Sequence, residues 1–226
     1  MARIARVVVP GVPHHVIQRG NRRLQTFFND QDYEAYIDLM DKWCSHWGVD
    51  IWSYCLMPNH VHLIAVPSSE KALTRAIGEA HRRYTRRVNL RENWRGHLWQ
   101  GRFASFPMDE AYLFMCVRYV ELNPVRAGLV SVPWQYRWSS AAAHVNREED
   151  RLIKRVSLLE EISDWQAFLM EGLSEENTHD IRLHARTGRP LGSEEFQAGL
   201  ERMLGRALQP QKRGPKGPRK KKTGEE

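Results

Sequence analysis

The sequence lacks any apolar run that approaches the roughly 20 residues needed to span a membrane. Its N-terminal apolar segment is short and interrupted by proline, which argues against a secretion signal. Cysteine is also scarce, because Cys44, Cys55 and Cys116 stand far apart among apolar residues. An odd, scattered set of this kind indicates buried free thiols in a reducing compartment, not a disulfide framework. We therefore expect a cytoplasmic protein.

Acidic residues are outnumbered, since 27 Asp and Glu face 34 Lys and Arg, leaving a formal net charge of +7 on 226 residues. Seven of the cations lie in the stretch "QKRGPKGPRKKKTGEE" (211–226) and equal the whole surplus. Such a stretch cannot bury enough apolar surface to fold alone, so residues 210–226 are expected to form a disordered basic tail. Two interpretations stay open for it: a solubilising segment, or a polyanion contact whose affinity depends on salt.

A second basic cluster lies inside the chain. Residues 75–102 carry eight arginines against two glutamates, and Trp94, Trp99 and Phe103 lie among or beside them. Planar guanidinium groups next to aromatic rings suit phosphates and unstacked bases better than a plain solvated face does. The cluster therefore indicates a nucleic acid as partner.

Hydrophobic periodicity predicts strands over residues 14–21, 49–57, 60–66 and 98–108, and helices over 30–48, 70–88 and 110–123. The expected N-caps are Asp30, either Ser68 or Ser69, and Asp109, and Gly48 should end the first helix. This β-α-β-β-α-β order is that of an α+β, ferredoxin-like split βαβ fold, one antiparallel sheet with two helices on one face. A further helix with a Ser193 cap is expected near the C-terminus.

The stretch "MPNHVHLI" places two histidines on one predicted strand. Residues at i and i+2 of a strand share a face, so His60 and His62 should lie side by side. One interpretation is a pair of histidines satisfied by hydrogen bonds. The other is a divalent-metal site, because neutral imidazole is the commonest nitrogen ligand. A structural zinc ion usually has four protein ligands, so two histidines indicate an ion with open coordination positions that substrate oxygens would share.

The third predicted helix carries a tyrosine and an asparagine four residues apart. Tyr119 and Asn123 therefore share one helix face. If that face meets the histidine strand, the Asn123 carbonyl completes a His-His-Asn shell that fits Mg²⁺ or Mn²⁺ and does not exclude zinc. Tyr119 would then lie beside the metal, where positioning and charge could make a phenol nucleophilic. The alternative is that Tyr119 is only a core aromatic of an apolar helix.

Several motifs occur in an order typical of one family. "HVH" matches the histidine signature of the HUH endonucleases, and it accompanies "PGVPHHVIQRGNRR", "LWQGRFASF" and "YVELNPVRAGLV". From about Arg3 to Trp138 the chain resembles the single-tyrosine transposases of the IS200/IS605 type, in particular their REP-associated branch. The stretch "TGRPLGSEEF" and the basic tail also resemble that branch.

The resemblance implies cleavage and rejoining of single-stranded DNA near hairpins, through a 5′-phosphotyrosine intermediate. It implies His60, His62 and Asn123 as metal ligands, with Asn123 standing where many members have glutamine, and Tyr119 as nucleophile. Tyr84 is the rival nucleophile, although its place on an apolar helix stripe explains it as a core residue. The candidate DNA-binding residues are Arg19, Asn21, Arg22, Arg82, Arg83, Arg86, Arg87, Arg102, Lys212 and Arg213.

We expect a catalytic domain over residues 1–145, a helical extension over 146–209 and the basic tail over 210–226. The long extension favours a monomer over the dimers of mobile relatives. Two other functions remain open: a single-stranded nucleic-acid-binding module without chemistry, and a metal-dependent hydrolase that uses a water nucleophile. A binding module would not need both the histidine pair and the Tyr-x₃-Asn spacing, and no RNP1-type aromatic pattern is evident.

Deleting the residues after Gln209 should weaken DNA binding and flatten its salt dependence, because the cations of the tail release counterions when they contact phosphates. The dissociation constant for a labelled hairpin, measured across a salt series, tests this expectation. Unchanged binding at every salt concentration would refute the polyanion contact and favour the solubilising interpretation.

Overall fold

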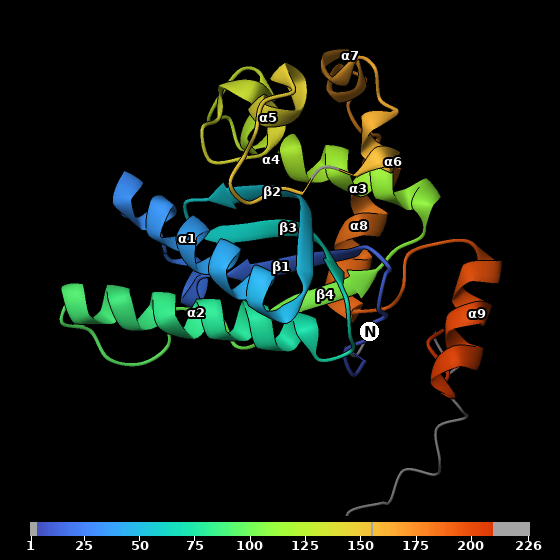
Figure 1. The fold of residues 1–226 in the computed structure, drawn as a ribbon, viewed down its shortest axis with the longest axis horizontal. Coiled ribbons are helices and arrows are strands. Elements are labelled where there is room, and N and C mark those ends of the chain that lie inside the picture. The colour runs from blue at the N-terminus through green and yellow to red at the C-terminus, as the bar shows by residue number, and fades with distance from the viewer. Residues whose placement is uncertain (1–3, 155, 210–226) are drawn as a thin grey trace, which may run out of the picture.

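A computed structural model describes residues 4–154 and 156–209. The first part of the chain forms β1 (His14–Arg19), α1 (Asp30–Trp47), β2 (Val49–Met57), β3 (His60–Pro67), α2 (Ala72–Arg91) and β4 (Ala104–Pro107), with a 3-10 turn (Asn21–Arg23) after β1. These strands form an antiparallel sheet in the order β2-β3-β1-β4. The predicted α+β, ferredoxin-like arrangement is therefore confirmed (Figure 1).

Helices make up the second part. After β4 come α3 (Glu110–Glu121), α4 (Asn123–Arg126), a 3-10 turn (Pro133–Gln135), α5 (Ala141–Asn146), α6 (Ser157–Glu160), α7 (Trp165–Met170), α8 (Glu175–Thr187) and α9 (Glu194–Leu204). Helix α3 packs against β2 and β3, while α8 packs against β4, β1 and α3. Across residues 4–154 and 156–209, none of the helices combines the length and the apolar character that crossing a bilayer requires.

Alternation along β3 divides its side chains between the two faces of the sheet. Val61, Leu63 and Ala65 enter a hydrophobic cluster with α1 and α2, which lie together in front of the sheet in Figure 1. Ile64 enters a different cluster, built with α3 and the later helices. His62 shares the face of Ile64 because the two residues are at positions i and i+2 of the strand. The histidine pair therefore faces away from α1 and α2.

Some predicted boundaries are wrong. The cap of α1 is Asn29, whose Oδ1 accepts a hydrogen bond from the Asp32 amide (3.1 Å), and Asp30 is the first helical residue. Neither predicted serine caps α2, because the chain turns first and the Ser68 amide donates to the Gly48 carbonyl (2.8 Å). The predicted strand 98–108 shortens to β4, since Gly101 has a φ of 66° and turns the chain before it.

Other boundaries are confirmed. Gly48 ends α1 in the left-handed region (φ 65°), which glycine adopts without strain. The Asp109 carboxylate accepts from the Tyr112 amide at the start of α3 (3.1 Å). The Ser193 hydroxyl accepts from the Phe196 amide at the start of α9 (3.2 Å).

A buried carboxylate fixes the end of α3. Glu121 is fully buried and accepts hydrogen bonds from Ser53 of β2 (3.1 Å), from Ser140 just before α5 (2.6 Å), from His144 of α5 (2.6 Å) and from Trp165 of α7 (2.8 Å). Burial alone would raise the pKa of this carboxyl, but His144 and the other donors hold it below its usual value. Because Tyr119 lies two residues earlier, this network also determines where that tyrosine stands.

Glu121→Gln should destabilise the fold by about 2 kcal/mol near neutral pH, because the amide nitrogen of Gln cannot accept from buried donors. The folded-state pKa is lowered, so the stabilising contribution is present above the unfolded pKa of about 4.3 and is lost as the pH falls through the folded value. Urea unfolding at neutral and acidic pH measures both effects.

The exposed Glu160→Gln serves as a matched control, with an expected change within about 0.5 kcal/mol. The gap in unfolding free energy between wild type and Glu121→Gln should narrow in acid. A gap of constant size from neutral pH to about pH 3 would contradict an ionised Glu121.

Candidate active site

The pairing of β1 with β3 positions the histidines. In this register Ile17 lies opposite His62 and Arg19 lies opposite His60. The rings of His60 and His62 have centroids 5.0 Å apart and planes at 81°. Two imidazoles thus lie side by side near the end of β3 that follows the Pro-Asn turn.

Neighbouring side chains determine which ring nitrogens remain available. Nδ1 of His60 is 2.6 Å from Oδ1 of Asn59, and Nδ1 of His62 is 2.8 Å from Nε2 of His15. Both Nε2 atoms are therefore left for an incoming ligand. The His15 contact has the form usual behind metal-binding histidines, where a second group orients the ring.

His15 was not among the candidates from the sequence. It is the second histidine of "HHVIQ". Its role follows only from strand pairing, since it lies opposite Ile64 and diagonal to His62. Both rings are buried and stack with centroids 5.0 Å apart. His15 lies two residues before Ile17, the residue of β1 that pairs with His62, and so shares its sheet face.

The imidazoles are neutral near pH 7. Burial, aided by Arg19 and Arg126, lowers the pKa of His60 to about 4. Burial and the neighbouring imidazoles lower the pKa of His62 well below its usual value, and burial lowers that of His15 to about 3. Neutral imidazole is the form that binds metal ions, so no proton competes with an ion for these ring nitrogens near pH 7.

Tyr119 of α3 lies against these rings. Its ring centroid is 5.7 Å from that of His62 and 5.8 Å from that of His15, and the side chain is 5% exposed. The guanidinium of Arg126, on α4, stands 3.9 Å from the centroid of the Tyr119 ring. A cation over the face of an aromatic ring is attracted by the ring quadrupole, so this contact helps to hold the Tyr119 ring in place. The sequence had not singled out Arg126.

Asn123 lies one turn beyond Tyr119, where α4 begins. It is 8% exposed, and its Nδ2 has no hydrogen-bond partner within the described residues. A buried amide N–H₂ group without a partner needs an acceptor, such as a substrate oxygen, whereas a metal ion would bind the carbonyl oxygen of the same side chain. Two neutral imidazoles and a carboxamide form a donor set that fits Mg²⁺ or Mn²⁺. In the described part of the chain no group of three or more His, Cys, Asp or Glu could hold an ion.

A cavity of about 740 Å³ opens beside Tyr119 and His62. Its lining contains no Asp or Glu but five arginines. Arg19 and Arg102, both predicted from the sequence to bind DNA, lie here together with Arg23, Gln18 and Gln100. The remaining two arginines come from α8. A hollow lined by unopposed cations next to a tyrosine and a histidine attracts phosphates.

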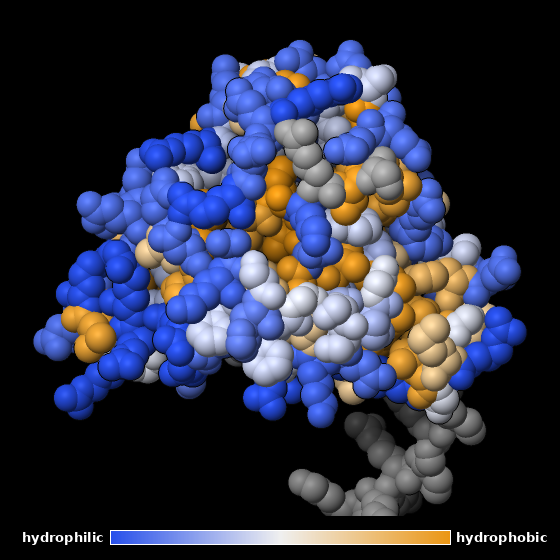
Figure 2. All heavy atoms as spheres, in the orientation of Figure 1, coloured by the Kyte–Doolittle hydropathy of each residue, from blue (hydrophilic) through white to orange (hydrophobic). Residues whose placement is uncertain are grey.

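The arginine-rich helix lies elsewhere. Its apolar stripe packs on the face opposite His62, so its arginines point to solvent away from the cavity. Arg82 and Arg83 both pair with Glu79 (2.7 Å each). Figure 2 shows a mostly hydrophilic surface around the C-terminal end of α2, at the lower left, and Arg86 and Arg87 border a separate hollow there. The predicted contact of the α2 arginines with DNA stays a prediction, and it would lie on a face of the protein away from this cavity.

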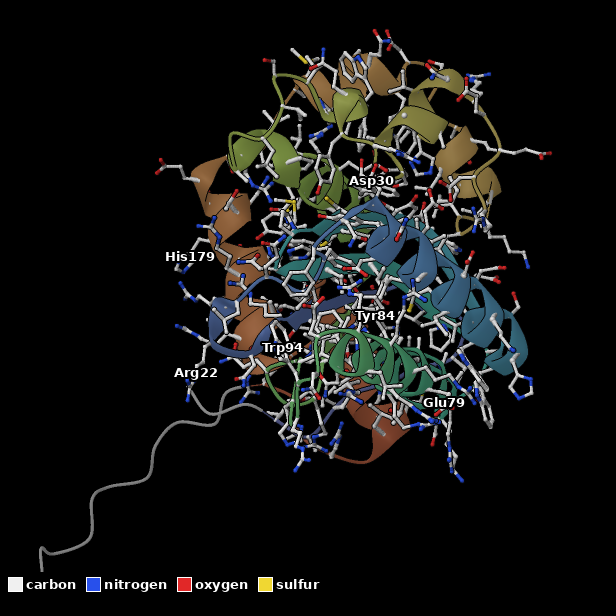
Figure 3. All side chains as sticks on the ribbon, turned by 90° about the vertical axis from the view of Figure 1, so that its left-hand side faces the viewer. Arg22, Asp30, Glu79, Tyr84, Trp94 and His179 are labelled. Atoms are coloured by element: carbon white, nitrogen blue, oxygen red, sulfur yellow. The ribbon has the colours of Figure 1, made fainter. Side chains whose placement is uncertain are left out.

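The other predicted DNA-binding residues have different placements. Asn21 and Arg22 form an exposed turn directly after β1, anchored by the Asn21 amide donating to the Leu98 carbonyl (2.8 Å). In Figure 3, Arg22 and His179 of α8 lie along one side of the molecule and Glu79 lies on the other. Lys212 and Arg213 lie outside the described residues.

Tyr84, the rival nucleophile, lies within the core. It is fully buried, its hydroxyl donates to the Thr26 carbonyl (2.7 Å), and burial raises its pKa. It packs against Phe27 and Tyr36 in the cluster on the sheet face opposite His62. Figure 3 labels Tyr84 in the interior of the molecule. This environment favours Tyr119 as the reactive phenol.

Comparisons with known proteins relate this chain to a transposase family. The sequence model of the IS200-like transposase family matches residues 9–123. The solved structure of a REP-associated tyrosine transposase bound to a REP hairpin matches with a TM-score of 0.55 and 20% identity, over 70% of this chain and 96% of that one. The crystal structure of a Deinococcus radiodurans R1 protein described as a transposase matches with a TM-score of 0.37 and 19% sequence identity. The match covers 56% of this chain and 92% of that one. A search of curated proteins found no match.

Proposed function

The chain belongs to the IS200-like transposase family, and from this premise we propose that it is a metal-dependent nuclease that cleaves and rejoins single-stranded DNA beside a hairpin. The observation that carries the proposal is the Tyr119 ring, which lies within 6 Å of the rings of His62 and His15 at the edge of an arginine-lined cavity. The hairpin-bound transposase of similar fold supports a DNA hairpin as partner.

Tyr119 is proposed as the nucleophile. Its Oη attacks the scissile phosphorus, the bond from tyrosine oxygen to phosphorus forms, and the bond from phosphorus to the 3′ oxygen breaks. The phenol loses its proton and the leaving oxygen gains one, which gives a 5′-phosphotyrosine and a free 3′-OH. One phosphodiester replaces another, so attack by a 3′-OH can rejoin strands without ATP.

The remaining residues prepare this step. Arg126 lies over the Tyr119 ring and helps to hold it in place, and the arginines of the cavity hold the phosphates that flank the scissile one. His60, His62 and Asn123 are the proposed ligands of the ion, and His15 orients His62. When bound, Mg²⁺ or Mn²⁺ supplies neutralisation of the charge that develops on the phosphate oxygens.

We also propose that the site works within one chain. Tyr119 lies beside His62 of its own subunit, and Glu121 ties its helix to β2, α5 and α7 of that subunit. This supports a monomer. We keep residues 1–145 as the catalytic unit, 146–209 as its extension and 210–226 as a basic tail, although residues of α7 and α8 share the hydrophobic cluster of Tyr119.

Tyr119→Phe should abolish cleavage while leaving DNA binding within about twofold, because only the attacking oxygen is removed. The substrate is a labelled hairpin with single-stranded flanks in the presence of Mn²⁺, and a denaturing gel reveals the covalent protein–DNA adduct. The rate should fall on the order of 1,000-fold or more.

Tyr112→Phe, on the same helix, is the matched control and should keep wild-type activity. Continued cleavage by Tyr119→Phe would contradict the proposal and favour a water nucleophile. A wild-type protein that binds the hairpin but never cleaves it would favour the binding module.

Removing divalent ions with a chelator should stop adduct formation and leave hairpin binding intact, and Mn²⁺ should restore the adduct. His62→Ala should weaken Mn²⁺ binding, measured by calorimetry, by at least about tenfold, since even a lost outer-shell partner costs about 10–100-fold. The exposed His179→Ala is the control. Full cleavage in excess chelator would contradict metal dependence.

A further inference from the structure

Helix α8 belongs to the extension, far beyond the residues 9–123 that match the family. It nevertheless packs against β4, β1 and α3 and reaches the same cavity as Tyr119. In Figure 1 it passes behind the sheet, on the side away from α1 and α2. A segment outside the family match therefore forms one wall of the candidate active site.

Buried residues of α8 anchor the helix against the rest of the protein. Ile181 is fully buried in the hydrophobic cluster that also contains Tyr119, and Thr187 is 1% exposed at the end of the helix. The ring of His184 lies 5.9 Å from that of Phe106 on β4. These contacts leave Arg182, Ala185 and Arg186 on the side that lines the cavity.

The two arginines of α8 differ from those arginines of the protein that are paired with carboxylates. Arg118, Arg137 and Arg151 each pair with a carboxylate. Within residues 4–154 and 156–209, neither Arg182 nor Arg186 makes an ion pair or a side-chain hydrogen bond, and both are exposed. They face Arg19, Arg23 and Arg102 across a cavity without carboxylates.

Cations gathered in one hollow repel each other unless an anion joins them, so this arrangement calls for a polyanion. Four residues of helix span about 6 Å, which lets Arg182 and Arg186 contact different phosphates along a strand. The neighbouring Gln100 is exposed and supplies an amide that can hydrogen-bond to bases. The chemistry fits an unpaired nucleic-acid strand that passes Tyr119.

We propose that Arg182 and Arg186 bind backbone phosphates of the single strand that leads into the Tyr119 site. This rests on the proposed function, because it places the strand to be cut in the cavity beside Tyr119. The extension is then part of the substrate-binding surface, and α8 contacts the unpaired flank and not the hairpin stem.

The test compares two DNAs in the Tyr119→Phe background, which prevents cleavage during binding measurements. One is a hairpin with a single-stranded flank and the other is the same hairpin without it. Arg182→Gln/Arg186→Gln should weaken binding of the flanked DNA by about tenfold or more. The slope of log affinity against log salt should become shallower by about 1.4, since each contact to single-stranded phosphate contributes about 0.7.

Binding of the hairpin without a flank should stay unchanged, and Arg182→Lys/Arg186→Lys should keep most of the salt slope. Lys42→Gln/Arg202→Gln removes two exposed charges outside the cavity and should change binding by less than about twofold. Thermal melting confirms that every variant folds. Equal losses for both DNAs, or for both charge-removing variants, would overturn the proposal.

The binding test of α8 and the adduct test of the proposed nuclease activity can fail independently. With Tyr119 intact, the wild type forms a covalent adduct if the nuclease assignment is right. An adduct in the wild type together with unchanged flank affinity in Arg182→Gln/Arg186→Gln would overturn only the role of α8. Absence of any adduct would overturn the nuclease assignment, while the binding data still decide what α8 does.

Discussion

The antiparallel pairing of β1 with β3 is the constraint on which the site depends. Its register brings His15, His60 and His62 to one face of the sheet, while Val61 and Leu63 fill the opposite core. A shift by one residue would send the histidines into that core and expose apolar residues beneath Tyr119. The large cluster with α1 and α2 therefore fixes the register, and through it the chemistry on the other face.

The second fixed element is the end of α3. Glu121 gathers donors from three parts of the chain, and this holds Tyr119 against His62 although their helix and strand are distant in sequence. Arg126 then follows on α4 and covers the tyrosine ring. A buried carboxylate, a phenol, a carboxamide and a guanidinium thus occur within eight residues, each facing a different partner. The short motif "YVELNPVR" encodes most of the site on this side.

Much of this could be predicted from the sequence, because local patterns decide it. The strand and helix order follows from periodicity, and the spacing of His60 with His62 and of Tyr119 with Asn123 follows from the geometry of strands and helices. His15 and the arginines of α8 were missed since only tertiary pairing brings them to the site. The distance of the α2 arginines from the cavity could not be predicted either, because composition does not say which sheet face their helix covers.

The central claim is that Tyr119 carries the DNA covalently. Trypsin should release residues 119–126 as one peptide, because Arg118 and Arg126 flank it. Mass spectrometry of the digested adduct should find the nucleotide on that peptide through its 5′ phosphate. A nucleotide on residues 84–86, which contain Tyr84, or a wild-type protein that cleaves without retaining any nucleotide, would contradict the account.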